Sequence, residues 1–303
     1  MKLIINADDF GIDIDRDIGI AYGVIKGYIT SVSVITTNKI GIIRKILINI
    51  IRKRASVGIH INLTDNPLIA FNLENLISKE YNYKKSKFSF WRNSINNTIN
   101  IKNIKKEIYK QLTKFVKEYK FFPNHIDGHN HCNIFNKEIE KIFEEISDKY
   151  RIHLRIPYEK LEDFDDKSIR NNEFFNDYYK FKNKNITDKD IIENLEYFFK
   201  YDMYINNYFS DKNCKKDMIN YIGTMYGYFR EPNILYNQLL KFSDNDIIQI
   251  MVHPGFFWKI IKHKTPFSNK DRLLELNSLK HLKNKVKQDK IEYVNYKVIT
   301  YEK

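Results

Sequence analysis

Two adjacent aspartates, Asp8 and Asp9, stand in the stretch NADDFG, directly after the apolar residues LII. Like charges side by side repel, and a buried carboxylate is costly unless it is paired or bound to a metal. Adjacent residues of a regular strand point to opposite faces, so the chain must turn here, and Gly11 permits such a turn. One carboxylate could then bind a divalent cation while the other takes a proton from a metal-bound water. The alternative is an Asx turn or the N-cap of a helix near residue 13, which would account for one aspartate.

The stretch HIDGHNH, residues 125–131, brings histidines and an aspartate close together. On an extended segment alternate residues share a face, which predicts that His125, Asp127 and His129 lie together, and His131 would follow if the extension continues. One imidazole can bind a metal while another, or the aspartate, supports it from behind. One Asp with two His is a common ligand set for a hydrolytic metal. A single histidine on a strand is more often a structural hydrogen-bonding residue, so the cluster carries the metal hypothesis.

Further polar residues stand at the ends of apolar runs that are typical of buried strands. His60 lies near the end of ASVGIHINL, Arg155 ends RIHLRIP, and His253 ends DIIQIMVH. In barrels and in open α/β sheets the carboxyl ends of the strands carry the active site, so we expect these side chains to converge. Imidazole titrates near neutral pH, so His253 could protonate a leaving group. The alternative for His253 is a capping role.

Strand-like runs alternate with helical patterns along most of the chain. Strands are predicted at 2–6, 29–36, 55–63, 124–129, 151–157 and 246–253, with weaker candidates at 217–223 and 292–299. Helices are predicted at 13–26, 40–52, 101–120, 135–149, 187–203, 232–241 and 270–287. This alternation predicts a parallel sheet with crossover helices. We therefore expect an α/β fold of one domain over residues 1–303, an irregular (β/α) TIM-like barrel, with an open doubly wound sheet as the alternative.

Residues 65–100 break this alternation with a polar and aromatic composition, and we expect an excursion over the barrel mouth. The aromatic part, residues 78–92, could stack on the rings of a bound ligand, pack on the barrel or form a dimer contact. Its aromatic side chains are Tyr81, Tyr83, Phe88, Phe90 and Trp91. Packing is the interpretation that we favour.

Charge and cysteine content restrict the partners and the compartment. The net charge of +13 comes from 51 Lys and Arg against 38 Asp and Glu, spread along the chain without a nucleic-acid-binding motif. We therefore predict a solvated basic surface, with no nucleic-acid partner and no membrane partner. Cys132 and Cys214 lie far apart without CxxC spacing, which favours a reducing cytoplasm over a disulfide framework. No segment has the run of about 18 apolar residues that a membrane helix needs.

Taken together, these stretches resemble one family. NADDFG, GYITSVSVITTN, VGIHINLT, HIDGHNH, LRIP and MVHPGF are similar, in order, to motifs of the YdjC-type carbohydrate deacetylases, and RLLELNSL near residue 275 also fits. That family includes chitooligosaccharide deacetylases and is related to the polysaccharide deacetylases. The resemblance implies an irregular (β/α) barrel, a homodimer, and a metal-dependent hydrolase that removes N-acetyl groups from amino sugars or short chitooligosaccharides.

The resemblance also implies a role for individual residues. Asp9, His60 and His129 would bind a divalent metal, with Mg or Zn expected and Mn or Co also compatible with such ligands. Asp8 would be the general base and His253 the general acid.

Further residues would support this set. Arg155 would orient or neutralise Asp8 in the catalytic group, while His125, Asp127 and His131 would line the site or support the ligands. Asn133 departs from the family pattern, because a further His is common there, and this change could alter a substrate contact.

Two other functions remain open at this point. The first is a different metal-dependent hydrolase on the same barrel, such as a phosphoesterase, because amide specificity comes only from the resemblance. The second is a carbohydrate-binding protein without catalysis. The joint presence of Asp8, Asp9, His60, His129 and His253 argues against the second, since binding a sugar needs no base, acid and metal together.

Overall fold

A computed structural model describes the parts of the chain that form the sheet, its flanking helices and the residues between them. The described residues are 1–64, 68, 90, 93–94, 96–157, 219–223, 232–256, 269–287, 289 and 291–299. The predicted helix at 187–203 and most of the predicted excursion at 65–100 lie outside them, with Tyr81, Tyr83, Phe88 and Trp91. Phe90 is described, and it is fully buried in the hydrophobic core.

The described strands form one parallel sheet, as the alternating pattern predicts. Its order is β5-β4-β3-β2-β1-β7-β6, and β8 pairs with the beginning of β1. The strands are β1 (Lys2–Phe10), β2 (Ser31–Val34), β3 (Ser56–Ile61), β4 (His125–Gly128), β5 (His153–Leu154), β6 (Asn220–Ile222), β7 (Ile247–Val252) and β8 (Glu292–Tyr293). Each lies inside a predicted strand or overlaps one, although β5 and β8 are much shorter than their apolar runs suggest.

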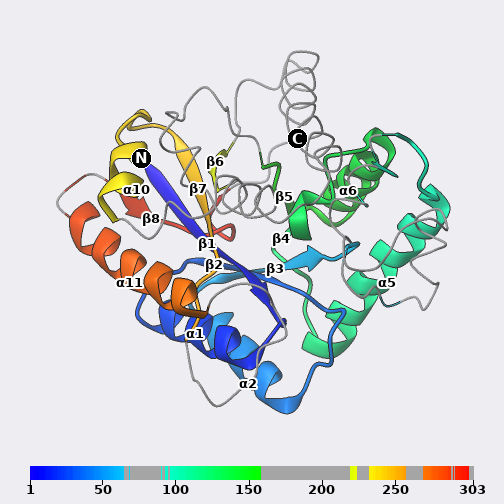
Figure 1. Ribbon diagram of the computed structural model, residues 1–303, viewed down its shortest axis with the longest axis horizontal. Coiled ribbons are helices and arrows are strands. Elements are labelled where there is room, and N and C mark those ends of the chain that lie inside the picture. Colours follow the sequence, from blue (N-terminus) through cyan, green and yellow to red (C-terminus); the bar gives the residue numbers. More distant parts are fainter. Residues whose placement is uncertain are drawn as a thin grey trace, which may run out of the picture.

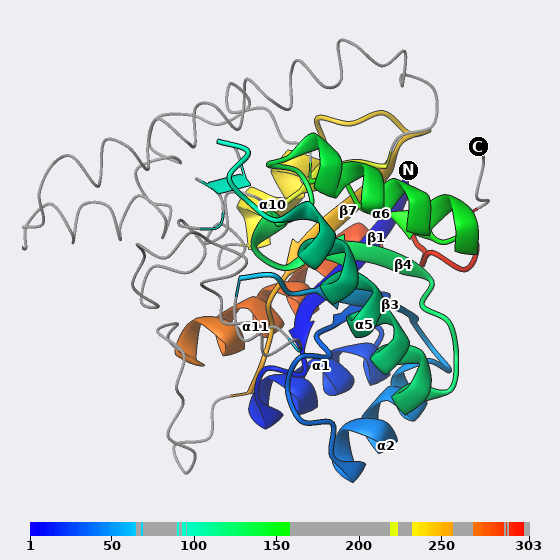
Figure 2. The ribbon, with the colours of Figure 1, turned by 90° about the vertical axis from the view of Figure 1, so that its right-hand side faces the viewer.

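Helices cover the outer side of this sheet. They are α1 (Ile14–Ile25), α2 (Ile42–Ile51), α5 (Ile101–Tyr119), α6 (Lys137–Tyr150), α10 (Pro232–Leu239) and α11 (Asn269–Val286). In Figure 1 they follow an arc around the central strands, and Figure 2 shows α5 and α6 in front of β3 and β4. The strands therefore form a half-barrel, an arrangement that is compatible with a TIM-like barrel. Among the described residues no pairing joins β5 to β6 to close it.

The helix boundaries follow from local chemistry. Asp13 caps α1, because its side chain accepts a hydrogen bond from the backbone N–H of Arg16 at 2.8 Å. Asn136 caps α6 in the same way, accepting from two backbone N–H groups of the first turn. The helix α5 ends at Lys120 and α6 at Arg151, and both residues take the left-handed conformation that is common after a helix.

The core lies between the strands and the surrounding helices. Isoleucine and valine side chains from β1, β2, β3 and β7 are fully buried there, against the apolar faces of the helices. At the amino ends of the strands, the segment 294–299 follows β8. Its Tyr296 is buried, and its ring stacks on His125 with the ring centres 4.3 Å apart. None of the helices in the described segments is long and apolar enough to cross a membrane.

Candidate metal centre and catalytic site

The two adjacent aspartates occupy an irregular part of β1. Asp9 has a φ of +70°, and the pairing of β1 with β2 shifts register between Ala7 and Phe10. Aspartate is one of the few residues that tolerate this left-handed conformation. The chain turns here as predicted, and both carboxylates reach the same site. Since Asp13 caps α1, neither Asp8 nor Asp9 is needed for that purpose.

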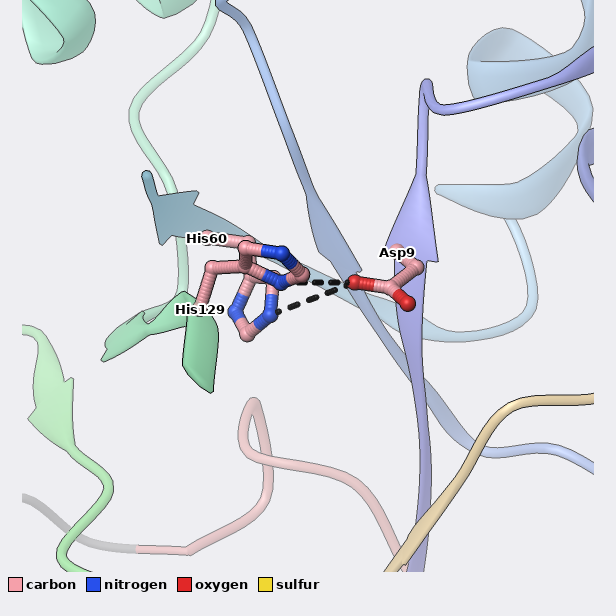
Figure 3. A group of neighbouring side chains, drawn as sticks. All are labelled: Asp9, His60 and His129. Carbon is pink, nitrogen blue, oxygen red and sulfur yellow. Dashed lines mark ion pairs between the residues drawn. The ribbon is translucent and has the colours of Figure 1, made fainter. Parts of the chain in front are cut away.

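Asp9 meets two histidines from neighbouring strands. Its Oδ1 atom lies 3.0 Å from Nδ1 of His129 and 3.6 Å from Nε2 of His60. Figure 3 shows the two imidazole rings beside each other, facing the carboxylate. One ligand atom from each residue lies within 4.8 Å of the others, and all three residues are largely buried. One carboxylate oxygen and two imidazole nitrogens at this spacing match the donors of a site for Zn²⁺ or a similar cation.

The orientation of His60 is set from behind. Its Nδ1 atom lies 2.6 Å from Oδ1 of Asp127, which leaves Nε2 to face Asp9. Metal-binding histidines commonly have such a carboxylate partner on the other nitrogen, because it fixes the tautomer and the ring orientation. The side chains of His60 and Asp127 are 2% and 0% exposed, so this hydrogen bond is shielded from water.

His129 reaches the site by a different path from the expected one. The strand β4 ends at Gly128, and a 3-10 turn follows at His129–His131. Asn130 and His131 there have left-handed φ values of +50° and +54°. The expectation that strand alternation continues through His129 to His131 is therefore wrong. It holds for His125 and Asp127, which both contact Ser33.

Asp8 is bound by Arg155, the residue that follows β5. Two nitrogens of the guanidinium each lie 2.7 Å from one carboxylate oxygen, and both side chains are 2% exposed. Burial by itself would raise the pKa of Asp8, but the charges of Arg155 and His60 outweigh burial and lower it. Asp8 is therefore ionised at neutral pH.

Arg155 also contacts Asp127, with its Nε atom 3.2 Å from Oδ2. Burial opposes ionisation of Asp127, yet Arg155 and His60 hold its pKa well below the usual range. Asp8, His60 and Asp127 form a second group with metal-ligand spacing. Both oxygens of Asp8 and both oxygens of Asp127 already accept hydrogen bonds, whereas the Oδ1 atom of Asp9 faces the two histidines. The group with Asp9 and His129 is therefore the better cation site.

His253 stands just after β7, on the side of the site nearest Asp9. Its Nε2 atom is 3.9 Å from Oδ2 of Asp9. The helix α11 holds its backbone, since its N–H donates to Glu275 at 2.6 Å and Arg272 donates to its carbonyl at 3.1 Å. Burial lowers the pKa of His253, while Asp9 and Glu275 act in the opposite direction.

Two predicted residues lie at the edge of this arrangement. His131 faces the ring of Tyr221 edge-on with the ring centres 6.3 Å apart, and burial lowers its pKa to about 3. Asn133 is buried and donates to the backbone carbonyl of Arg155 at 3.2 Å. It therefore supports the chain next to Arg155.

The structure adds residues that sequence patterns did not single out. Arg16 in α1 forms an ion pair with Oδ2 of Asp9 at 2.6 Å, and both side chains are buried. Ser33 in β2 contacts three side chains beneath the site. Arg272 and Glu275 lie one helical turn apart within RLLELNSL, a stretch that carried only family resemblance. The one sequence feature near Arg16 is its place in the first turn of α1 after the acidic end of β1, and this does not identify Asp9 as its partner.

Comparison with known proteins finds relatives over all or about half of the chain. A carbohydrate deacetylase of Clostridium beijerinckii is 25% identical over 310 residues, covering 99% of this chain and all of that protein. A chitooligosaccharide deacetylase of Proteus mirabilis is 28% identical over 158 residues, 51% of this chain and 58% of its own.

A solved structure supports the fold, and a family model covers the chain. An Enterococcus faecalis V583 protein named for cellobiose-phosphate cleavage superposes with a TM-score of 0.64 at 18% identity, over 98% of this chain and 97% of its own. The model of the YdjC-like proteins matches residues 2–288, from β1 to the end of α11. The chain therefore belongs to the YdjC-like protein family.

Proposed function

We propose that the protein is a metal-dependent carbohydrate deacetylase that removes N-acetyl groups from amino sugars or short chitooligosaccharides. The relatives named carbohydrate deacetylase and chitooligosaccharide deacetylase support the activity. The observation that carries the mechanism is the gathering of ligand atoms of Asp9, His60 and His129 within 4.8 Å of one another. Asp8 lies 3.6 Å from Nε2 of His60, and His253 lies 3.9 Å from Asp9. A ligand set, an ionised carboxylate and an imidazole together are what hydrolysis of an amide requires.

Asp9, His60 and His129 would hold the divalent cation. The cation would lower the pKa of a water molecule and polarise the acetyl carbonyl oxygen. The Asp127 contact keeps Nε2 of His60 directed at the site, and Arg16 occupies the Oδ2 atom of Asp9 so that Oδ1 faces the histidines. Mg and Zn are the expected ions, with Mn and Co as alternatives.

Asp8 would act as the general base. Arg155 keeps it ionised, so it can accept a proton from the attacking water without first losing one. The same two hydrogen bonds fix the carboxylate in one orientation. His60 lies 3.6 Å away, which places the base beside a proposed metal ligand. Arg155 thus serves as the residue that orients Asp8.

His253 would act as the general acid and protonate the departing amine. Its Nε2 atom lies 3.9 Å from Oδ2 of Asp9, while α11 fixes its backbone. Because burial lowers the pKa of His253, its imidazolium form gives up a proton more readily than a histidine in water. His131 would line the site near Tyr221, and His125 and Asp127 would support the ligands from below.

The other expectations extend this proposal. We infer that residues 1–303 form a single complete barrel with the excursion at 65–100, and that the chain acts as a cytoplasmic homodimer. The two widely spaced cysteines support the compartment, and the family resemblance supports the barrel and the dimer. The half-barrel of described strands is compatible with closure.

The first test measures acetate release from di-N-acetylchitobiose and related N-acetyl sugars. Protein treated with chelator should lose activity, and adding back Mg, Zn, Mn and Co one at a time should identify the ion that restores it. Asp9→Asn, His60→Gln and His129→Gln should each lose turnover and bind metal much more weakly in calorimetry. His281→Gln is the matched control, because His281 is exposed on α11.

The outcomes separate the candidate functions. Full turnover by the three ligand variants would refute the assigned site. Phosphate release from sugar phosphates without acetate release would favour the phosphoesterase alternative. Sugar binding that chelator does not change, with no turnover on any substrate, would favour a binding protein without catalysis.

A further inference from the structure

Ser33 of β2 lies directly beneath the site, and its hydroxyl contacts three polar side chains. Its Oγ atom lies 2.6 Å from Oδ2 of Asp127, 2.8 Å from Nδ2 of Asn6 and 2.9 Å from Nε2 of His125. All four residues are fully buried, with no exposed surface. Water therefore does not compete for these contacts, and each partner depends on the hydroxyl.

The donor and acceptor roles in this cluster follow from counting hydrogens. The hydroxyl of Ser33 has one hydrogen, and it donates that hydrogen to Oδ2 of Asp127. The two lone pairs of Ser33 then accept from the amide of Asn6 and from Nε2–H of His125. Burial lowers the pKa of His125, which agrees with a neutral ring that donates through one nitrogen. The hydroxyl therefore makes all three hydrogen bonds that it can, one as donor and two as acceptor.

Two partners of Ser33 contact residues with proposed catalytic roles, the base Asp8 and the metal ligand His60. Asn6 also donates to Oδ1 of Asp8 at 2.6 Å, and Asp127 uses its other oxygen to hold Nδ1 of His60 at 2.6 Å. We propose that Ser33 is a positioning residue that fixes the base Asp8 and the metal ligand His60 relative to each other. This inference rests on the proposed function, because it takes those two roles as given.

Arg155 spans the same two carboxylates, yet its contribution differs. It supplies the positive charge that keeps Asp8 and Asp127 ionised. Ser33 is neutral and leaves that charge balance unchanged when its hydroxyl is removed. Loss of the hydroxyl should therefore leave the Arg155 contacts and the charges in place. It would break the connection from Asn6 to Asp127, so Asp8 and His60 could shift relative to each other.

The experiment compares three serine-to-alanine variants in strands of the same sheet. Ser33→Ala should weaken metal binding about tenfold, the lower end of what residues behind metal ligands contribute, and should lower kcat with little change in KM. Ser31→Ala is the matched control, because Ser31 is buried two residues earlier and its Oγ atom has no hydrogen-bond partner in the described part of the chain. Ser56→Ala is the second control. It removes the hydrogen bond that Ser56 donates to the carbonyl of Thr30 and the one that it accepts from the N–H of Tyr296, and neither involves a proposed metal ligand.

Metal affinity by calorimetry, kcat, KM and the melting temperature are measured for each variant. Ser56→Ala should lower the melting temperature while keeping wild-type metal affinity, which separates stability from positioning. The pair Ser33→Thr and Ser33→Val provides a second comparison, since these side chains have nearly the same shape and differ by the hydroxyl. We expect the Thr variant to bind metal more tightly than the Val variant.

Two results would overturn the proposal. If Ser33→Ala matches Ser31→Ala in metal affinity and kcat, or if the Thr and Val variants behave alike, Ser33 has no positioning role. A wild-type protein that binds no metal and releases no acetate would instead overturn the proposed function, and this inference with it. The wild-type measurement therefore distinguishes the two failures.

Discussion

Replacing Arg155 should destabilise the protein strongly, by an amount that depends on pH. The guanidinium binds Asp8 through two 2.7 Å contacts and Asp127 through one of 3.2 Å, with all three side chains at most 2% exposed. Removing one partner of a buried ion pair leaves an uncompensated charge and costs about 3–5 kcal/mol. In Arg155→Met we therefore expect the free energy of unfolding to fall by about 4 kcal/mol at pH 8.

The pH dependence follows from the two carboxylates. In the wild type their pKa values are lowered in the fold, so their contribution to stability is complete above the unfolded pKa of about 3.9 and is lost as the pH falls further. Without Arg155, burial dominates and should raise both pKa values above the unfolded value. As the pH falls, protonation of these carboxylates removes their unpaired buried charge. The difference in the free energy of unfolding between variant and wild type should therefore shrink from pH 8 to pH 5.

Urea denaturation followed by circular dichroism at pH 8 and pH 5 measures both effects, with chelator present so that only metal-free protein is compared. Arg155→Lys keeps the charge but cannot bind the carboxylate of Asp8 through two nitrogens, so its free energy of unfolding should lie between those of the wild type and Arg155→Met. Lys141→Met removes an exposed ion pair with Glu138 and should have no measurable effect. If the free energy of unfolding of Arg155→Met falls by less than about 1 kcal/mol at pH 8, or by the same amount at both pH values, the reasoning is refuted.

Two further predictions concern the surroundings of the site. Arg16→Met removes the arginine partner of Oδ2 of Asp9, so the melting temperature should fall in metal-free protein. Saturating metal should largely restore it by supplying positive charge, and equal losses with and without metal in a thermal shift assay would contradict this. In Gly19→Ala the new Cβ would lie 2.5 Å from the backbone of the loop that carries His253, so kcat should fall while metal affinity is kept. Gly41→Ala is the control, because a Cβ there would have no atom within 4 Å. An unchanged kcat in Gly19→Ala would contradict the prediction and show that the loop adapts.

The sequence predicted the parts of the site that depend on strand ends. Asp8, Asp9, His60 and Arg155 follow or end apolar runs, and parallel strands bring such positions to one edge. The turn at Asp9 could also be inferred, because two adjacent carboxylates cannot otherwise face one side.

Other contacts were beyond the reach of sequence patterns. The path to His129 depends on left-handed residues in a short turn, and no periodicity signals such a turn. Arg16 and Ser33 act through tertiary contacts of a helix and a central strand, and their types alone do not indicate partners. The length of β5 was overestimated for a related reason, since an apolar run indicates burial but does not define where strand pairing stops.

The strand that bears Asp8 and Asp9 has a consequence for how the protein is made. Along Lys2–Ala7 it pairs with β7, and Lys2 and Leu3 also pair with β8, so its beginning is held by segments far along the chain. During synthesis β1 is made long before β7 and β8, and pairing over such a sequence separation is slow. The beginning of β1 should therefore reach its final pairing only after residues 247–293 are synthesised. Because His253 follows β7, the site would be complete only at that stage, and a nascent chain released earlier would expose an apolar strand to aggregation.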